Sequence, residues 1–289
     1  MRTFCLLFAS LFSLTALAAD KLPVVASFSI LGDLVAEVGG DKVAVTTLVG
    51  PDGDAHVYQP TPQDAKAVAA AKLVVVNGLG LEGWMDRLFK TSASHTQQLV
   101  ASTGVPTRKG EGGKIDPHAW QDPARVRVYV QNIDRGLASA DPANASVYHQ
   151  RAQAFLARLT ALETWADQTI AKVPSSKRRV ITSHDAFGYL GARFGITFLA
   201  PQGMGTETEA TAKDVGELIK QIRAEHIRAV FVENITNPRL IQQVASETHV
   251  QLGPELYSDA LSKADGPAAH YEDMMRHNIT ALVAGMKLN

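Results

Sequence analysis

The stretch DPANASVYHQRAQAFLARLTALETWADQTIAKVP, residues 141–174, decides the fold. Between Pro142 and Pro174 it holds neither glycine nor proline, and no run typical of a strand. Its larger apolar residues recur at the spacing of one helix face: Phe155, Leu159, Leu162, Ala166 and Ile170. We therefore expect a single helix over residues 142–173, about 30 residues and about 45 Å long. A helix of that length spans more than one domain and can join two.

Strand-like and helix-like segments alternate on both sides of this helix. Before it, the strand-like runs are residues 22–28, 43–50 and 72–78. The helix-like segments between them are residues 29–40 and 61–71. After it, the strand-like runs are residues 178–184, 196–200, 227–234 and 250–256. The helix-like segments there are residues 186–195, 212–226, 238–249 and 271–286. Such alternation favours parallel sheets covered by helices.

The expected fold class is therefore α/β, with two parallel-sheet lobes joined by one long backbone helix. We place the N-terminal lobe at residues 20–141, the linking helix at residues 142–173 and the C-terminal lobe at residues 174–289. Ligands of open α/β sheets lie beyond the carboxyl ends of the strands. The cleft between the two lobes is thus the expected binding site.

Residues 1–19 are typical of a secretory signal peptide. A short charged start precedes an apolar stretch that is too brief to span a bilayer permanently, and Ala16-Leu17-Ala18 matches a cleavage pattern. The only cysteine, Cys5, lies ahead of most of this apolar stretch, so it is badly placed to carry a lipid. We expect a soluble periplasmic protein without cysteine, which excludes disulfides and thiolate metal sites.

Composition and charge exclude one class of partner. Hydrophobic residues make up 46% and charged residues 20% of the 289 residues, and the net charge is −1 without a long charged run. Nucleic acids and anionic membrane surfaces attract proteins with clustered positive charge. We therefore expect no nucleic-acid partner.

Four residues carry possible metal ligands in loops or at strand ends. His56 lies in a loop rich in glycine, proline and aspartate, and His118 lies between two prolines. His184 ends one strand-like run, and Asp259 follows another. Three imidazoles and a carboxylate suit zinc or another first-row divalent ion. Because the four are far apart in the sequence, they could meet only through tertiary folding.

Each of these residues also has an ordinary structural interpretation. A single histidine in a polar loop is usually a solvated side chain, and an aspartate before a helix is usually its cap. The other histidines lie in helices, at helix ends or in polar loops and suggest no ligand role: His95, His149, His226, His249, His270 and His277. The residue pattern alone therefore leaves a metal site as one alternative.

Segments around the four residues resemble one known family. The family comprises the metal-binding proteins of bacterial ABC importers for zinc and manganese, the ZnuA/TroA-like cluster A-I of solute-binding proteins. The similar segments follow the family's order: HVYQPTPQD (56–64), DPHAWQDP (116–123), SHDAFGYLGARFG (183–195) and ELYSDAL (255–261). The resemblance runs from Leu22 to the C-terminus and implies two α/β lobes joined by a backbone helix. It also places four residues at the metal-ligand positions: His56, His118, His184 and Asp259.

The third ligand position bears on the choice of metal. Manganese- and iron-binding members of this family typically have glutamate there and zinc-binding members histidine, so His184 implies Zn²⁺ as cargo, with Mn²⁺ or Fe²⁺ as the alternative. An imidazole-rich site also favours zinc on chemical grounds. Many zinc members carry a His- and acid-rich loop before the second ligand, but residues 103–115 hold no histidine. This departure favours a plain carrier and leaves room for a cargo other than zinc.

The resemblance implies a monomeric periplasmic protein that captures Zn²⁺ and delivers it to an inner-membrane ABC permease and its ATPase. One alternative is a zinc-dependent hydrolase, which would need an open coordination position and a general base. The sequence has no H-E-x-x-H motif, and Asp259 already offers a fourth ligand, so we expect no enzyme. Another alternative is a carrier of a chelated metal or other solute, or an adhesin-like surface protein.

Acidic residues near the ligands are candidates for orienting the imidazoles. Asp116 and Asp185 flank His118 and His184, and Glu233 ends a strand-like run on the side where the ligands gather. Each of the three could equally be a cap or turn residue.

Overall fold

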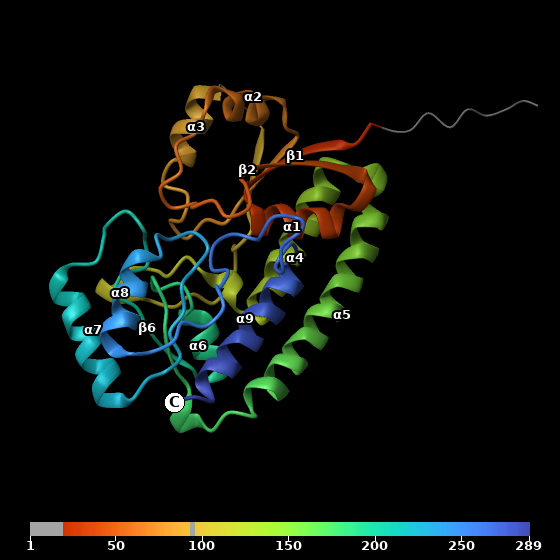
Figure 1. The fold of residues 1–289 in the computed structure, drawn as a ribbon. Coiled ribbons are helices and arrows are strands. Elements are labelled where there is room, and N and C mark those ends of the chain that lie inside the picture. Colours follow the sequence, from red (N-terminus) through yellow and green to blue (C-terminus); the bar gives the residue numbers. More distant parts are fainter. Residues whose placement is uncertain (1–19, 93–95) are drawn as a thin grey trace, which may run out of the picture.

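The computed structural model describes residues 20–92 and 96–289. The predicted signal peptide, with Cys5, and the histidine at position 95 lie outside the described residues. Figure 1 shows two lobes with one long helix, α5, running along the side of both. The expected α/β class, with two lobes joined by a backbone helix, is thereby confirmed.

The first lobe is built on a parallel sheet of four strands in the order β2-β1-β3-β4. The strands are β1 Leu22–Phe28, β2 Val43–Val49, β3 Leu73–Val76 and β4 Gln97–Val100. Strands β1 and β3 are central, mostly apolar and almost fully buried, as expected of parallel strands. Strand β4 escapes prediction because it lies at the edge of the sheet, where its sequence QQLV is half polar and largely exposed.

Four helices accompany this sheet: α1 Ser29–Gly39, α2 Pro62–Ala70, α3 Met85–Ser92 and α4 Pro123–Ala140. Helix α2 begins with a capping box between Thr61 and Asp64, which fixes the end of the loop that carries His56. Helix α4 has no counterpart among the predicted segments and begins directly after DPHAWQD, with Asp122 as its N-cap. Short 3₁₀ turns lie at Gly40–Lys42, Glu111–Gly113, Ala119–Gln121, Pro142–Asn144 and Ser175–Lys177.

The linking helix α5 spans Ala145–Ile170, 26 residues in all. Every residue predicted to lie on its apolar face is buried, and the face packs against α1 and α4 of the first lobe and α9 of the second. The helix is shorter at both ends than the predicted range of 142–173. Pro142–Asn144 forms a 3₁₀ turn instead, and the chain leaves the helix before Pro174, since a residue that precedes proline avoids helical geometry.

The second lobe carries a smaller parallel sheet, formed by β5 Arg179–Ile181 and β6 Thr197–Leu199. The predicted strands at 227–234 and 250–256 are wrong as continuous strands. They pair only through isolated parallel bridges, which join Ile181 to Val230, Val230 to Leu252 and Glu233 to Leu256. Gly253-Pro254 interrupts the second run, because proline offers no amide to a ladder. The helices of this lobe are α6 Gly188–Phe194, α7 Ala212–Glu225, α8 Arg239–Thr248 and α9 Tyr271–Met286.

Two apolar cores hold the described chain together. The main core runs without a break from β1 through α5 into α9, so it belongs to both lobes. A smaller one, which we call the outer core, lies between α7, α8 and the second sheet: Ile181, Val215, Leu218, Ile219, Ile222, Ile227, Val230, Ile241, Val244 and Val250. Among the described helices, none is both long and apolar enough to cross a membrane.

Candidate metal centre

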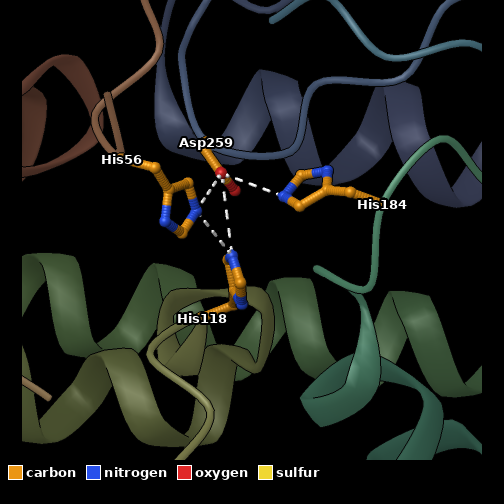
Figure 2. Close-up of side chains that lie close together, drawn as sticks. All are labelled: His56, His118, His184 and Asp259. Carbon is orange, nitrogen blue, oxygen red and sulfur yellow. Dashed lines mark hydrogen bonds and ion pairs between the residues drawn. The ribbon is translucent and has the colours of Figure 1, made fainter. Parts of the chain in front are cut away.

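The four predicted ligand residues converge between the lobes (Figure 2). Their ligand atoms all lie within 4.8 Å of one another. The Oδ2 atom of Asp259 lies 3.1 Å from the Nε2 atoms of His56 and His184 and 3.6 Å from that of His118. The Nε2 atoms of His56 and His118 are 3.3 Å apart. Three nitrogens and one oxygen thus surround a common point, as the tetrahedral coordination of a first-row ion requires.

All four residues lie outside the regular strands and helices, in loops between them. His56 lies in the loop between β2 and α2, and His184 follows β5. His118 directly precedes the 3₁₀ turn Ala119–Gln121, and Asp259 follows the bridge that pairs Leu256 with Glu233. The side chains of His118, His184 and Asp259 are fully buried, and that of His56 is 4% exposed. Water is therefore almost excluded from the point at which they meet.

The ring of His118 is held from behind by Asp116. The Oδ1 atom of Asp116 lies 2.8 Å from Nδ1 of His118 and accepts the backbone N–H of the same residue at 2.9 Å. Its Oδ2 atom accepts a hydrogen bond from the guanidinium of Arg108. A carboxylate on Nδ1 fixes the ring orientation and leaves Nε2 facing the common point.

Glu233 lies behind His184 and contacts its ring as an ion pair. Its Oε2 atom lies 2.6 Å from Nδ1 of His184, and its Oε1 atom accepts the backbone N–H groups of Ser183 at 2.7 Å and His184 at 2.9 Å. One carboxylate therefore positions both the ring and the backbone of this residue.

The remaining positions differ from these two pairs. No hydrogen bond or ion pair within the described chain joins the carboxylate of Asp185 to any of the four residues, and its backbone N–H donates to Gly203. The Nδ1 atom of His56 likewise has no hydrogen-bond acceptor among the described residues. Asp54 instead accepts the backbone N–H of His56 at 2.8 Å. Asp116 and Glu233 thus each contact the Nδ1 atom of one imidazole, and Asp185 contacts none of the three rings.

The electrostatics of the cluster favour a bound cation. Burial raises the pKa of Asp259, but His118 and His184 outweigh burial and hold the pKa well below its ordinary value. Burial lowers the pKa of His118, and the carboxylates of Asp259 and Asp116 outweigh burial and raise it to about 9. A divalent cation would take the place of these protons. The Oδ1 atom of Asp259 is also buried without a hydrogen-bond partner in the described structure, so the residues present fit a metal ion.

Three residues that sequence reasoning missed hold the Asp259 segment in place. The indole of Trp120 and the side-chain amide of Gln121 both donate to the carbonyl of Ser258, at 2.9 and 2.6 Å. The side chain of Asn278 in α9 bonds both the N–H and the carbonyl of Tyr257. Trp120 and Gln121 follow His118 within the recognised segment DPHAWQDP, so their position was the signal available.

The other described histidines lie elsewhere and do not join the cluster. His149 contacts Asp134, and His270 contacts Asp33. His226 and His249 are the C-cap residues of α7 and α8, where each adopts left-handed backbone geometry. The ring of His277 donates to the carbonyl of Glu255. Helix termination and surface hydrogen bonds account for these five residues.

The sequence matches one known protein family over nearly its whole length. The family described as zinc-uptake complex component A, periplasmic (ZnuA), matches residues 24–285. That range includes all four residues of the cluster and both lobes.

Three similar proteins carry the names of three different metals. The manganese-binding lipoprotein MntA of Halalkalibacterium halodurans is 32% identical over 269 residues, which cover 92% of this chain and 89% of that protein. The iron-binding protein YfeA of Yersinia pestis is 32% identical over 288 residues, covering 96% and 93%. The solved structure of the periplasmic zinc-binding protein TroA from Treponema pallidum superimposes with a TM-score of 0.88 at 29% identity and covers 92% of this chain and 99% of that one.

Proposed function

The chain belongs to the family of periplasmic zinc-uptake components, and we propose that it captures Zn²⁺ between its lobes and delivers it to an inner-membrane ABC permease. At the level of the family, the protein is a periplasmic metal-binding substrate-binding protein of an ABC transporter. Family membership also confirms the expectation that it is not an enzyme. The metal ion is accordingly cargo, not a catalytic cofactor.

The proposed ligands are His56, His118, His184 and Asp259. The observation that carries this assignment is their convergence within 4.8 Å at a buried point. A closed site with four protein ligands retains an ion without activating a water molecule. Retention without reaction is what a carrier needs.

Zinc is the proposed cargo because of the donor set. Three imidazole nitrogens and one carboxylate oxygen match the ligands and the geometry that zinc prefers, whereas harder ions prefer more oxygen. His184 is central to this argument, since a carboxylate at its position would give two oxygens and two nitrogens. Its pairing with Glu233 supports a neutral imidazole that coordinates through Nε2.

A second candidate cargo is Mn²⁺ or Fe²⁺. The relatives MntA and YfeA, named for manganese and iron, support it, since they match nearly the whole chain. The unpartnered Oδ1 atom of Asp259 also supports it, because bidentate binding by this carboxylate would add the second oxygen that a harder ion prefers.

We further propose that the mature chain is a soluble monomer in the periplasm and works with an inner-membrane permease and its ATPase. The relative from Halalkalibacterium halodurans is named a lipoprotein. The only cysteine of this chain is Cys5, ahead of most of the apolar stretch of the predicted signal peptide, which supports cleavage without a lipid anchor.

A competition experiment tests the cargo. Mature protein stripped with chelator is exposed to equal concentrations of Zn²⁺, Mn²⁺ and Fe²⁺, desalted, and analysed by plasma mass spectrometry. His184→Ala runs beside it, with His149→Ala, a mostly exposed histidine on α5, as the matched control. One zinc per chain in the wild type and in His149→Ala, and a sharply reduced content in His184→Ala, is the expected result. Retained manganese or iron would move the protein to the second candidate, and no retained metal in any form would refute the site.

A further inference from the structure

Among the hydrogen bonds that join the lobes around the metal cluster, two sets differ clearly in burial. The first lies behind His118 and Asp259, where Trp120 and Gln121 bond the carbonyl of Ser258. The hydroxyl of Tyr271 in α9 also donates to the carbonyl of Trp120 at 2.8 Å. All of these residues are at most 1% exposed and adjoin the main core. We therefore expect these hydrogen bonds to stay formed when the metal ion enters or leaves.

The second connection lies on the side of His56 and is only partly buried. The Oδ1 atom of Asp54 accepts the backbone N–H of His56 at 2.8 Å, and its Oδ2 atom accepts the hydroxyl of Thr206 at 2.6 Å. Asp54 belongs to the first lobe and Thr206 to the second. One carboxylate thus links the backbone of a proposed ligand to the opposite lobe.

The loop that carries Thr206, residues 200–211, also reaches a ligand of its own lobe. Gln202 pairs with His184 through an isolated bridge, and the N–H of Asp185 donates to Gly203. The side-chain amide of Gln202 donates to the carbonyls of Thr206 and Thr208, at 3.2 and 2.9 Å, which fixes the shape of the loop. Loop 200–211 therefore links two of the proposed ligands. Its backbone pairs with His184, and its residue Thr206 reaches His56 through Asp54.

His56 is the ligand best placed to move. It lacks the carboxylate on Nδ1 that holds each of the other two imidazoles, and its loop lies partly at the surface. A cleft of about 1000 Å³ opens beside it, lined by both lobes and including loop 200–211. His56 is the only one of the four proposed ligands that lines this cleft.

We propose that Thr206 is a positioning residue that holds His56 in place through Asp54 and so sets the rate at which the metal ion leaves. Breaking the Thr206–Asp54 hydrogen bond removes the contact between the second lobe and the residues next to His56, and it lets this ligand swing toward the cleft. The start of the loop stays tied to the second lobe, because Asp52 bonds Leu261 and Asn234. His118 and Asp259 stay fixed by the buried connection, and His184 stays fixed by Glu233. This inference rests on the proposed function, because it assumes that the four residues bind the transported ion.

The test compares Thr206→Val, which keeps the shape of the side chain and removes its hydroxyl, with Thr206→Ser, which restores the hydroxyl. Thr208→Val, two residues along the same loop and exposed, is the matched control. Each full mature protein is loaded with Zn²⁺, or with Mn²⁺ if that is the ion retained. Release of the bound ion to an excess of a chromogenic chelator is followed by stopped-flow absorbance. Thermal unfolding of the metal-free variants shows whether they fold alike.

Thr206→Val is expected to release the ion about tenfold faster, because a hydrogen bond to a charged group is among the stronger kinds. Thr206→Ser and Thr208→Val should release it at nearly the wild-type rate, and all four proteins should bind one ion per chain. A Thr206→Val rate within twofold of wild type, with stoichiometric binding, would overturn the role of Thr206 and leave the proposed function standing. Failure of the wild type to retain any ion would instead refute the proposed function.

Discussion

At the residue scale, the three imidazoles of the cluster differ in what lies behind their rings. Asp116 and Glu233 lie on the Nδ1 atoms of His118 and His184, whereas Asp54 bonds the backbone of His56. A carboxylate on Nδ1 raises the basicity of the ligand and fixes its orientation. The affinity for the ion should therefore depend on these carboxylates as well as on the ligands.

Glu233→Gln should weaken metal binding by about 10- to 100-fold. The amide keeps the shape of the side chain and an oxygen for the backbone N–H groups, but it removes the charge behind His184. Competition against a chelator of known affinity measures the change. Glu247→Gln, an exposed change in α8, is the control and should bind as the wild type does. Equal affinities for the two variants would limit Glu233 to a role in backbone positioning.

A second residue-scale prediction concerns His270, which joins α9 to α1. Its Nδ1 atom lies 2.7 Å from Asp33, and this hydrogen bond raises the pKa of His270 above its ordinary value of 6.5. A raised pKa means that the contact stabilises the fold below pH 6.5 and loses this effect as pH rises through the folded pKa. Burial raises the pKa of Asp33 as well, so the effect is also lost in acid once this carboxylate is protonated.

An NMR titration of His270 should therefore give a pKa above 6.5 in the wild type and a lower one in Asp33→Asn. The difference in the free energy of unfolding between the two proteins should be largest in mild acid and shrink in mild alkali. An unchanged pKa in Asp33→Asn would contradict this origin of the shift.

The four residues of the cluster could be named from the sequence, and the residues that support them could be named only in part. His56, His118, His184 and Asp259 lie in segments with a recognisable local pattern. Asp116 and Glu233 could be named because they lie near ligands or strand ends, but nothing local separated them from Asp185. The bonds of Trp120 and Gln121 to Ser258 join residues more than 130 positions apart, and no local pattern encodes such a contact.

At the element scale, strong periodicity was the reliable signal. The apolar face of α5 and the buried strands β1 and β3 have patterns that a single sequence reveals, because one face or the whole run is apolar. Strand β4 is polar because it is an edge, and the runs at 227–234 and 250–256 are apolar without forming continuous ladders. An apolar run therefore indicates that a segment is buried. It does not show that the segment forms a continuous hydrogen-bonded strand.

The apolar face of α5 yields a stability prediction. Leu162 is fully buried against the main core, so Leu162→Ala should lower the free energy of unfolding by about 2–5 kcal/mol. Thr164→Ala, on the exposed side of the same turn, should change it by less than about 0.5 kcal/mol. Chemical denaturation measures both, and a similar loss in the two variants would contradict the assignment of the helix faces.

At the scale of the whole molecule, the lobes share one core. The main core passes through α5 and α9 into both lobes, and fully buried bonds join the segments of His118 and Asp259. Separation of the lobes as rigid bodies would expose this shared core. Metal exchange should therefore involve loops more than lobes.

X-ray scattering profiles of the metal-free and metal-loaded protein should superimpose, with closely similar radii of gyration. The comparison is made on the same chelator-stripped preparation before and after one equivalent of ion is added. Asp259→Ala, treated with the same ion, controls for effects of the ion on the solution. A large decrease in the radius on loading would contradict a shared core that stays closed.

The separate outer core implies that this corner of the protein can open without the rest. It consists of ten buried residues between α7, α8 and the second sheet, and loop 200–211 joins it to the proposed ligand His184. Small cooperative units of this kind exchange their amide hydrogens faster than the main core, and a ligand that binds only the closed form protects them. Hydrogen exchange in α7 and α8 should therefore slow when the ion is bound, with α5 little changed. An empty carrier would then be more open to proteases at this corner than a loaded one, so its lifetime would report whether it holds cargo.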